Sequence, residues 1–118
     1  MTYIFRISSL ILSLLISMNT YAVNQTEINH LLSYVEKTPC RYGRNGDMYT
    51  GIEALAHIQK KYHYFIDDIK TTEDFIKYSA TKSKMSGKFY HIQCLGQPKV
   101  KSKDWLLTEL KRFRANPE

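Results

Sequence analysis

Several kinds of sequence signal are scarce or absent in this chain of 118 residues. It has two cysteines, Cys40 and Cys94, and no C-x-x-C spacing that would support a zinc site. The chain lacks the His-Glu-x-x-His motif of zinc proteases and the Gly-x-Ser-x-Gly elbow of serine hydrolases. The chain also lacks the RNP, zinc-finger and helix-turn-helix signatures of nucleic-acid binding. We therefore expect no metal or other cofactor and no nucleic-acid partner.

Long apolar runs are scarce too, and the one present lies near the start, at residues 7–17. Arg6 precedes this run, and Thr20-Tyr21-Ala22 follows it with the small residues of a cleavage site. A membrane-spanning helix needs about 20 apolar residues, so this run is too short to span, and no second run follows. The pattern predicts a cleavable signal peptide of residues 1–22. Residues 23–118 are then one small exported domain, periplasmic or secreted, without a membrane span.

Export changes how the two cysteines are interpreted. In an oxidising compartment, an even pair of cysteines favours a disulfide over a metal site or a reactive thiol. Cys40 and Cys94 each lie in or beside a segment that reads as extended. A catalytic thiol would need a neighbouring base, which the sequence does not place. We therefore predict a Cys40–Cys94 disulfide.

Charge is distributed unevenly along the predicted domain. Residues 23–75 hold six Lys or Arg and eight Asp or Glu, whereas residues 76–118 hold ten Lys or Arg and three Asp or Glu. A basic half of this kind attracts polyanions in a salt-dependent way. Outside the cytoplasm these include lipid headgroups and envelope polymers. The same lysines also fit a solvated surface without a ligand.

Capping residues and helical spacing of apolar side chains predict four helices. In the second helix we expect Ile52, Leu55 and Ala56 on the core side, with Ile58 nearby. That choice places His57 outside the core stripe. The four helices are expected to begin at Asn24, Thr50, Thr71 or Thr72, and Ser102.

Short strands are predicted between these helices. Asn45-Gly46 accepts the positive φ angles of a tight turn and separates residues 40–44 from residues 47–49, which predicts a hairpin. Residues 88–94 read as a further strand, and a turn at residues 96–98 leads to a short segment at residues 99–100. The expected fold class is α+β, with about four helices packed on a small, mainly antiparallel sheet of two to four short strands.

The motifs in the middle of the chain, taken together and in order, resemble the YfeK-like family of small exported bacterial proteins of unknown function. The resemblance covers roughly residues 41–113. It implies export and supplies no reaction. The residues that carry it are Arg44-Asn45-Gly46, Tyr49, Glu53-Ala54, His57-Ile58, Lys61, residues 69–76, and Ser86-Gly87-Lys88 with Tyr90.

These motif positions define a candidate binding surface. We expect a non-enzymatic binding or accessory protein of the envelope, whose partner is an envelope protein or an anionic envelope component. One alternative is a small envelope hydrolase that uses His57, oriented by Glu53, with a serine or water; another is a basic protein that adheres to anionic membranes or polymers. A third interpretation of the His57 face is a solvated helix surface. The candidate residues are Arg44, Asn45, Tyr49, His57, Lys61, Lys88 and Tyr90.

Overall fold

Local signals place the helices and strands along the chain. A computed structural model describes residues 24–117, so the predicted signal peptide lies outside the described part. The elements follow one another as α2 (Gln25–Lys37), β1 (Arg41–Arg44), β2 (Asp47–Tyr49), α3 (Gly51–Tyr64), a 3-10 turn (Ile66–Asp68), α4 (Thr72–Ser79), β3 (His91–Gln93), β4 (Val100–Lys101) and α5 (Ser102–Ala115).

Three of the predicted helix starts are confirmed by their caps. The side chain of Asn24 accepts a hydrogen bond from the Glu27 amide, and Thr71 accepts one from the Asp74 amide. Thr50 and Glu53 form a complete capping box at the start of α3. The fourth prediction is wrong in detail, because the N-cap of α5 is Lys101 rather than Ser102.

The Ser102 side chain has a different role from capping. It is fully buried, and its Oγ lies 2.6 Å from the hydroxyl of the buried Tyr42. Burying two hydroxyls is costly unless each has a partner, and here they satisfy one another. Ser102 therefore joins the start of α5 to the inner side of β1.

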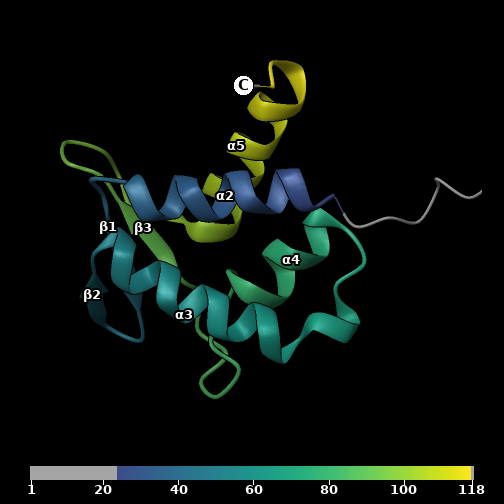
Figure 1. The fold of residues 1–118 in the computed structure, drawn as a ribbon. Helices are drawn as coiled ribbons and strands as arrows, with labels where there is room; N and C mark the ends of the chain where they lie inside the picture. Colours follow the sequence, from purple (N-terminus) through teal and green to yellow (C-terminus); the bar gives the residue numbers. More distant parts are fainter. Residues whose placement is uncertain (1–23, 118) are drawn as a thin grey trace, which may run out of the picture.

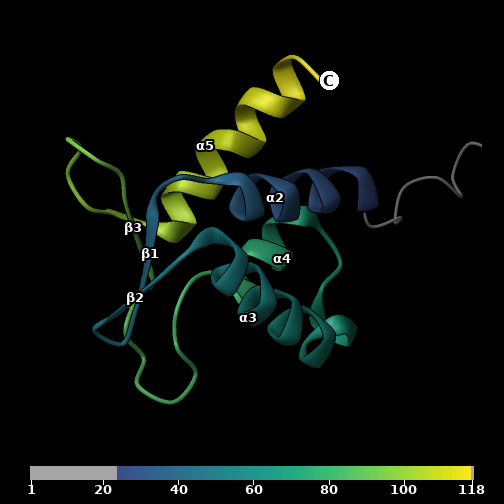
Figure 2. The same ribbon diagram turned by 60° about the vertical axis from the view of Figure 1, so that its left-hand side comes forward.

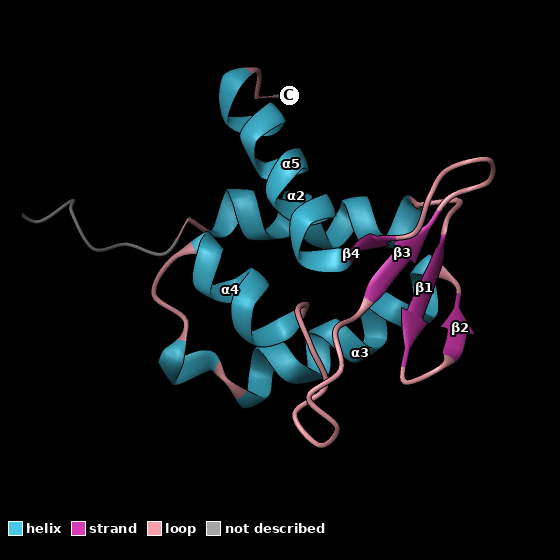
Figure 3. Ribbon diagram, turned by 180° about the vertical axis from the view of Figure 1, so that it is seen from behind, coloured by secondary structure: helices cyan, strands magenta, loops and turns pink. Residues whose placement is uncertain are grey.

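The four strands form one antiparallel sheet in the order β2-β1-β3-β4. Asn45 and Gly46 both have positive φ, 51° and 86°, as the Asn-Gly prediction requires. β3 is shorter than the predicted strand over residues 88–94. The α+β prediction is confirmed, with four helices described and the sheet at one side of them (Figures 1 and 3).

The core lies between the helices and the inner face of the sheet. Tyr42 and Ile92 are paired across β1 and β3 and are each 1% exposed. The helices contribute aliphatic and aromatic side chains, and α5 crosses α2 steeply above them (Figures 1 and 2). The buried helical residues include Ile28, Leu31, Val35, Ile58, Phe75, Ile76, Leu106 and Leu110.

The predicted core stripe of α3 needs a correction. Ile52 is 70% exposed, Leu55 is only partly buried and Ala56 is exposed, whereas Ala54 and Ile58 are buried. The reason is the contact at Gly51, where a Cβ atom would lie 2.3 Å from the Val35 carbonyl oxygen of α2. With Gly51 held against α2, the residues three and seven positions later face the core.

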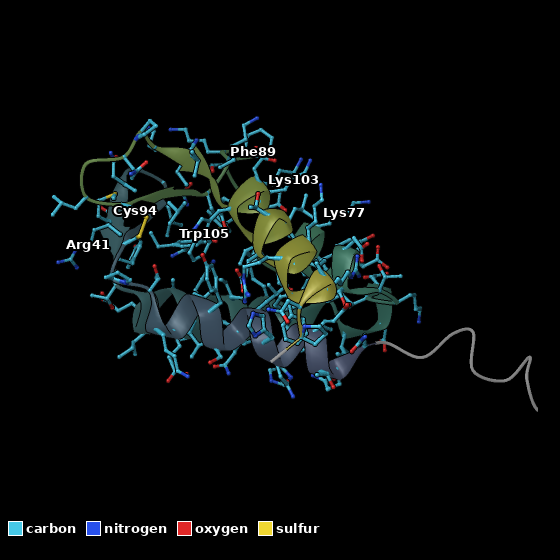
Figure 4. All side chains as sticks on the ribbon, turned by 90° about the horizontal axis from the view of Figure 1, so that it is seen from above. Arg41, Lys77, Phe89, Cys94, Lys103 and Trp105 are labelled. Carbon is cyan, nitrogen blue, oxygen red and sulfur yellow. A yellow bond between two sulfur atoms is a disulfide. The ribbon has the colours of Figure 1, made fainter. Side chains whose placement is uncertain are left out.

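The disulfide prediction is confirmed. Cys40 and Cys94 are bonded, with 4.4 Å between their Cα atoms and 54 residues of sequence separation. The bond links the residue before β1 to the residue after β3, and Trp105 lies between it and the body of α5 (Figure 4). Closing a loop of this length stabilises a small domain by on the order of 4 kcal/mol in the chain-entropy model.

An ion-pair cluster joins three helices at the other end of the molecule. Arg114 of α5 donates from Nε to Glu27 Oε2 at 2.7 Å and from Nη1 to Glu73 Oε2 at 3.0 Å. Thr72 donates a further hydrogen bond to Glu27 at 2.6 Å. Part of the acidic half of the sequence therefore packs on a cation of the basic half.

No helix in residues 24–117 is long and apolar enough to cross a membrane.

Candidate functional site

The hairpin tip is held by a loop that is distant in sequence. Residues 83–88 fold back so that the Ser86 hydroxyl donates to Asn45 Oδ1 at 2.7 Å. The loop is closed by the Ser83 amide donating to the Lys88 carbonyl and the Gly87 amide donating to the Ser83 carbonyl, both at 2.9 Å. In Figure 3 the β1–β2 turn and this loop lie at the same end of the molecule.

His57 points toward the sheet. Because Ala54 and Ile58 face the core, His57 lies beside them and is partly buried. Its Nε2 is 3.0 Å from the hydroxyl of Tyr90, whose side chain is almost fully buried. The two rings meet edge to face, with centroids 5.7 Å apart. The sequence placed His57 outside the core stripe, and the structure places it at the margin of the core.

Lys61 lies one helical turn after His57 and faces the same tyrosine. Its Nζ donates to the Lys82 carbonyl at 2.7 Å and to the Tyr90 hydroxyl at 3.3 Å. The ammonium group is also 4.9 Å from the centre of the Tyr90 ring, within range of a cation–π contact. The Lys82 carbonyl oxygen and the Tyr90 hydroxyl oxygen thus hold the ammonium group in place. Neither of these two partners is a carboxylate, so neither neutralises its charge.

Arg44 is the last residue of β1 and brings a guanidinium group to the same place. Its Nε is buried and has no hydrogen-bond partner. This nitrogen pairs with neither Asp47 nor Glu53. A buried donor without a partner costs free energy, so the fold holds the Arg44 guanidinium group in this place at a cost.

These residues line a pocket of about 310 Å³ between α3, the hairpin tip and the loop. We call it the cationic pocket. Four of its lining side chains are Lys or Arg and none is Asp or Glu; Glu53 lines a smaller adjoining hollow of about 140 Å³. The lining residues are Arg44, Asn45, His57, Lys60, Lys61, Tyr64, Phe65, Ser83, Lys84, Met85 and Tyr90.

The surroundings disfavour positive charge on His57 and Lys61. Burial, with the nearby cations Arg44, Lys61 and Lys60, lowers the pKa of His57 to about 4. Burial and then Arg44 lower the pKa of Lys61 to about 8. Burial raises the pKa of Tyr90, and Arg44 opposes that change. At neutral pH the pocket therefore holds a neutral histidine, a protonated tyrosine and cations that repel one another.

The structure brings five of the seven predicted surface residues together. Arg44, Asn45, His57, Lys61 and Tyr90 all line the cationic pocket. Tyr49 lines the small adjoining hollow with Arg44 and His57. Lys88 lies on the other side of the hairpin tip, in a hollow on the outer side of the sheet.

Two lysines of the pocket were missing from the prediction. Lys60 lies three residues after His57 on α3, on the same helix face. The helical spacing alone therefore indicates that Lys60 lies beside His57. Lys84 comes from the loop, where its Nζ donates to the Tyr64 hydroxyl at 3.0 Å and lies 4.7 Å from that ring's centre. Only the folding back of the loop places Lys84 here, and no local pattern signals it.

The geometry gives a hydrolytic site little support. An enzyme would bring His57 and a nucleophile together in a concave pocket, and the pocket is concave. However, the hydrogen bond of His57 goes to Tyr90, while the Ser83 hydroxyl accepts from the Ser86 amide at 3.3 Å. A pKa of about 4 also makes His57 a weak base at neutral pH. Among residues 24–117, no group of three or more His, Cys, Asp or Glu side chains is arranged to hold a metal ion.

Comparison with known proteins places the chain in a family. The model of a family of unknown function, DUF5329, matches residues 22–114. No curated protein and no solved structure matches the chain. The match covers most of the sequence, including every residue of the cationic pocket. The chain therefore belongs to the DUF5329 family of proteins of unknown function.

Proposed function

We propose that this protein is an exported, non-enzymatic binding protein whose cationic pocket holds an anionic group, such as a phosphate or sulfate, of an envelope component. One observation carries the proposal: four cationic side chains line one pocket without a carboxylate. Like charges that are held close together repel one another. A bound anion would be attracted to each of the cations and would offset this repulsion.

The donors are suited to such a ligand. Arg44 lines the pocket and offers a planar fork that matches phosphate and carboxylate oxygens. Lys61 and the Tyr90 hydroxyl are already positioned by their mutual contact at 3.3 Å. A ligand oxygen would therefore meet donors that lose little side-chain freedom on binding.

Export remains part of the proposal. The predicted signal peptide ends at Ala22, and the family match begins at residue 22. The disulfide fits an oxidising compartment such as the periplasm or the extracellular space. We propose that residues 23–118 form the mature single domain and that the YfeK-like resemblance describes its closer relatives.

Sulfate and inorganic phosphate are direct probes of the pocket. We expect isothermal titration calorimetry to show binding, and a tenfold excess over Kd to add about 1.4 kcal/mol to the free energy of unfolding. The variants Arg44→Met and Lys61→Met should abolish both effects. Lys103→Met removes an exposed lysine of α5 outside the pocket and is the matched control. Absence of binding to either anion, or equal losses in the control, would contradict the proposal.

A further inference from the structure

The outer face of the sheet carries a row of side chains across all four strands. Met48, Gly43, His91 and Lys101 are successive partners in the strand pairing, from β2 through β1 and β3 to β4. Tyr42 and Ile92, which neighbour this row, point into the core, so the row points outward. Gly43 has no side chain, and the row therefore dips at β1.

This dip is part of a hollow of about 520 Å³, which we call the sheet hollow. Three of its lining side chains, Arg44, Lys88 and Lys99, are cations, and one, Asp47, is an anion. At its margin Lys101 Nζ lies 4.2 Å from the centre of the Phe89 ring, which leaves 40% of Phe89 exposed. The sheet hollow thus has the same sign of charge as the cationic pocket.

The two hollows meet at the hairpin tip. Arg44 and Asn45 line both of them, and the other lining residues differ. The cationic pocket alone, at about 310 Å³, has the volume of roughly ten water molecules in the liquid. A single small anion therefore fills little of the two hollows. The positive surface therefore continues around the tip, from the loop side to the outer face of the sheet.

The directions of the donors indicate the kind of anion. In the cationic pocket, Arg44 comes from β1, Lys61 from α3 and Lys84 from the loop, so donors approach from different sides. A planar carboxylate is satisfied by one guanidinium fork, whereas a tetrahedral phosphate presents oxygens in several directions. Successive phosphates of one chain would then reach Lys88 and Lys99 beyond the tip.

We propose that the ligand is a linear phosphate polymer that places one phosphate in the cationic pocket and continues across the hairpin tip into the sheet hollow. This inference rests on the proposed anion-binding function and names its ligand class. Lys88 and Lys99 of the sheet hollow act on the polymer and have no part in binding a single phosphate.

The test compares orthophosphate, tripolyphosphate and long-chain polyphosphate as probes, with polygalacturonate as a polymer of carboxylates. We expect affinity per phosphate to rise with chain length and polygalacturonate to bind more weakly than polyphosphate. Lys88→Gln with Lys99→Gln should weaken long-chain polyphosphate binding about tenfold and leave orthophosphate binding within about twofold. The same double variant should reduce the slope of log affinity against log salt by about 1.4.

A matched control removes the same charge elsewhere. Lys77→Gln with Lys103→Gln changes two exposed lysines on α4 and α5 that line neither hollow (Figure 4). If orthophosphate binds but chain length has no effect, or if both double variants lose the same affinity, the polymer proposal is wrong and the anion pocket stands. Tighter binding of polygalacturonate overturns the phosphate assignment. Failure of every phosphate probe to bind refutes the anion pocket itself.

Discussion

Replacing Lys61 with methionine should make the domain more stable while removing its anion site. The pKa of this lysine falls from 10.5 to about 8, chiefly through burial and secondly through Arg44. A shift of that size corresponds to about 3 kcal/mol of unfavourable charging in a fully enclosed site. The side chain is only partly buried, so solvent screening reduces the cost, and we expect a net gain of about 1 kcal/mol in Lys61→Met.

The pH dependence of this gain has a definite sign. The folded state binds the Lys61 proton more weakly than the unfolded state, so the contribution of Lys61 to stability rises with pH between about 8 and 10.5. It is at its most unfavourable below pH 8 and disappears above pH 10.5. The advantage of Lys61→Met should therefore be largest at pH 7 and shrink as pH rises through this window.

Urea unfolding followed by circular dichroism at pH 7, 8.5 and 10 measures the effect. In a separate thermal unfolding experiment at pH 7, the gain should raise Tm by about 4–8 °C. Lys60→Met, an exposed neighbour on the same helix, is the control and should change stability by less than about 0.5 kcal/mol. A Lys61→Met protein that is no more stable than wild type at pH 7, or whose advantage does not fall with pH, would refute this account of the pocket.

Three other predictions follow from the same structure. Sulfate affinity should fall as pH rises through about 8, because Lys61 then loses its proton, and calorimetry of Lys61→Arg should show no such fall. Changing both Cys40 and Cys94 to serine should cost about 2–4 kcal/mol in urea unfolding, and a thiol count on unfolded, unreduced wild type should find none free. Arg114→Met should cost about 2 kcal/mol at pH 7, because the buried Glu27 loses its guanidinium partner. That loss should shrink below the ordinary carboxylate pKa of 4.5, since Arg114 lowers the pKa of Glu27; an acid-independent difference would count against it.

Most elements of the fold follow from signals only a few residues long. The caps at Asn24, Thr50 and Thr71 lie where the sequence predicts them, and so does the Asn45-Gly46 turn. Each signal depends on a hydrogen bond or a backbone angle within one turn of chain. Local chemistry is therefore enough to locate it.

The orientation of α3 could not be found in the same way. Its apolar residues Ile52, Leu55 and Ala56 suggest one inward face, but the close contact at Gly51 selects the face of Ala54 and Ile58. The start of α5 is a similar case. The local sequence predicts Ser102 as the N-cap, but its hydroxyl forms a hydrogen bond with the Tyr42 hydroxyl in the core. In both places, packing against a distant element outweighs the local pattern.

By itself, the sequence determined the α+β class, three of the four helix starts, the hairpin and the disulfide pairing, because a small domain with two cysteines leaves few alternatives. It also singled out five of the residues that line the cationic pocket and missed the other six, which are Lys60, Tyr64, Phe65, Ser83, Lys84 and Met85. Only the tertiary structure decided that these residues share a pocket without a carboxylate. Arg44, Lys61 and Lys84 come from three separate segments, and their charges come together only when the loop folds back toward α3 and the hairpin tip.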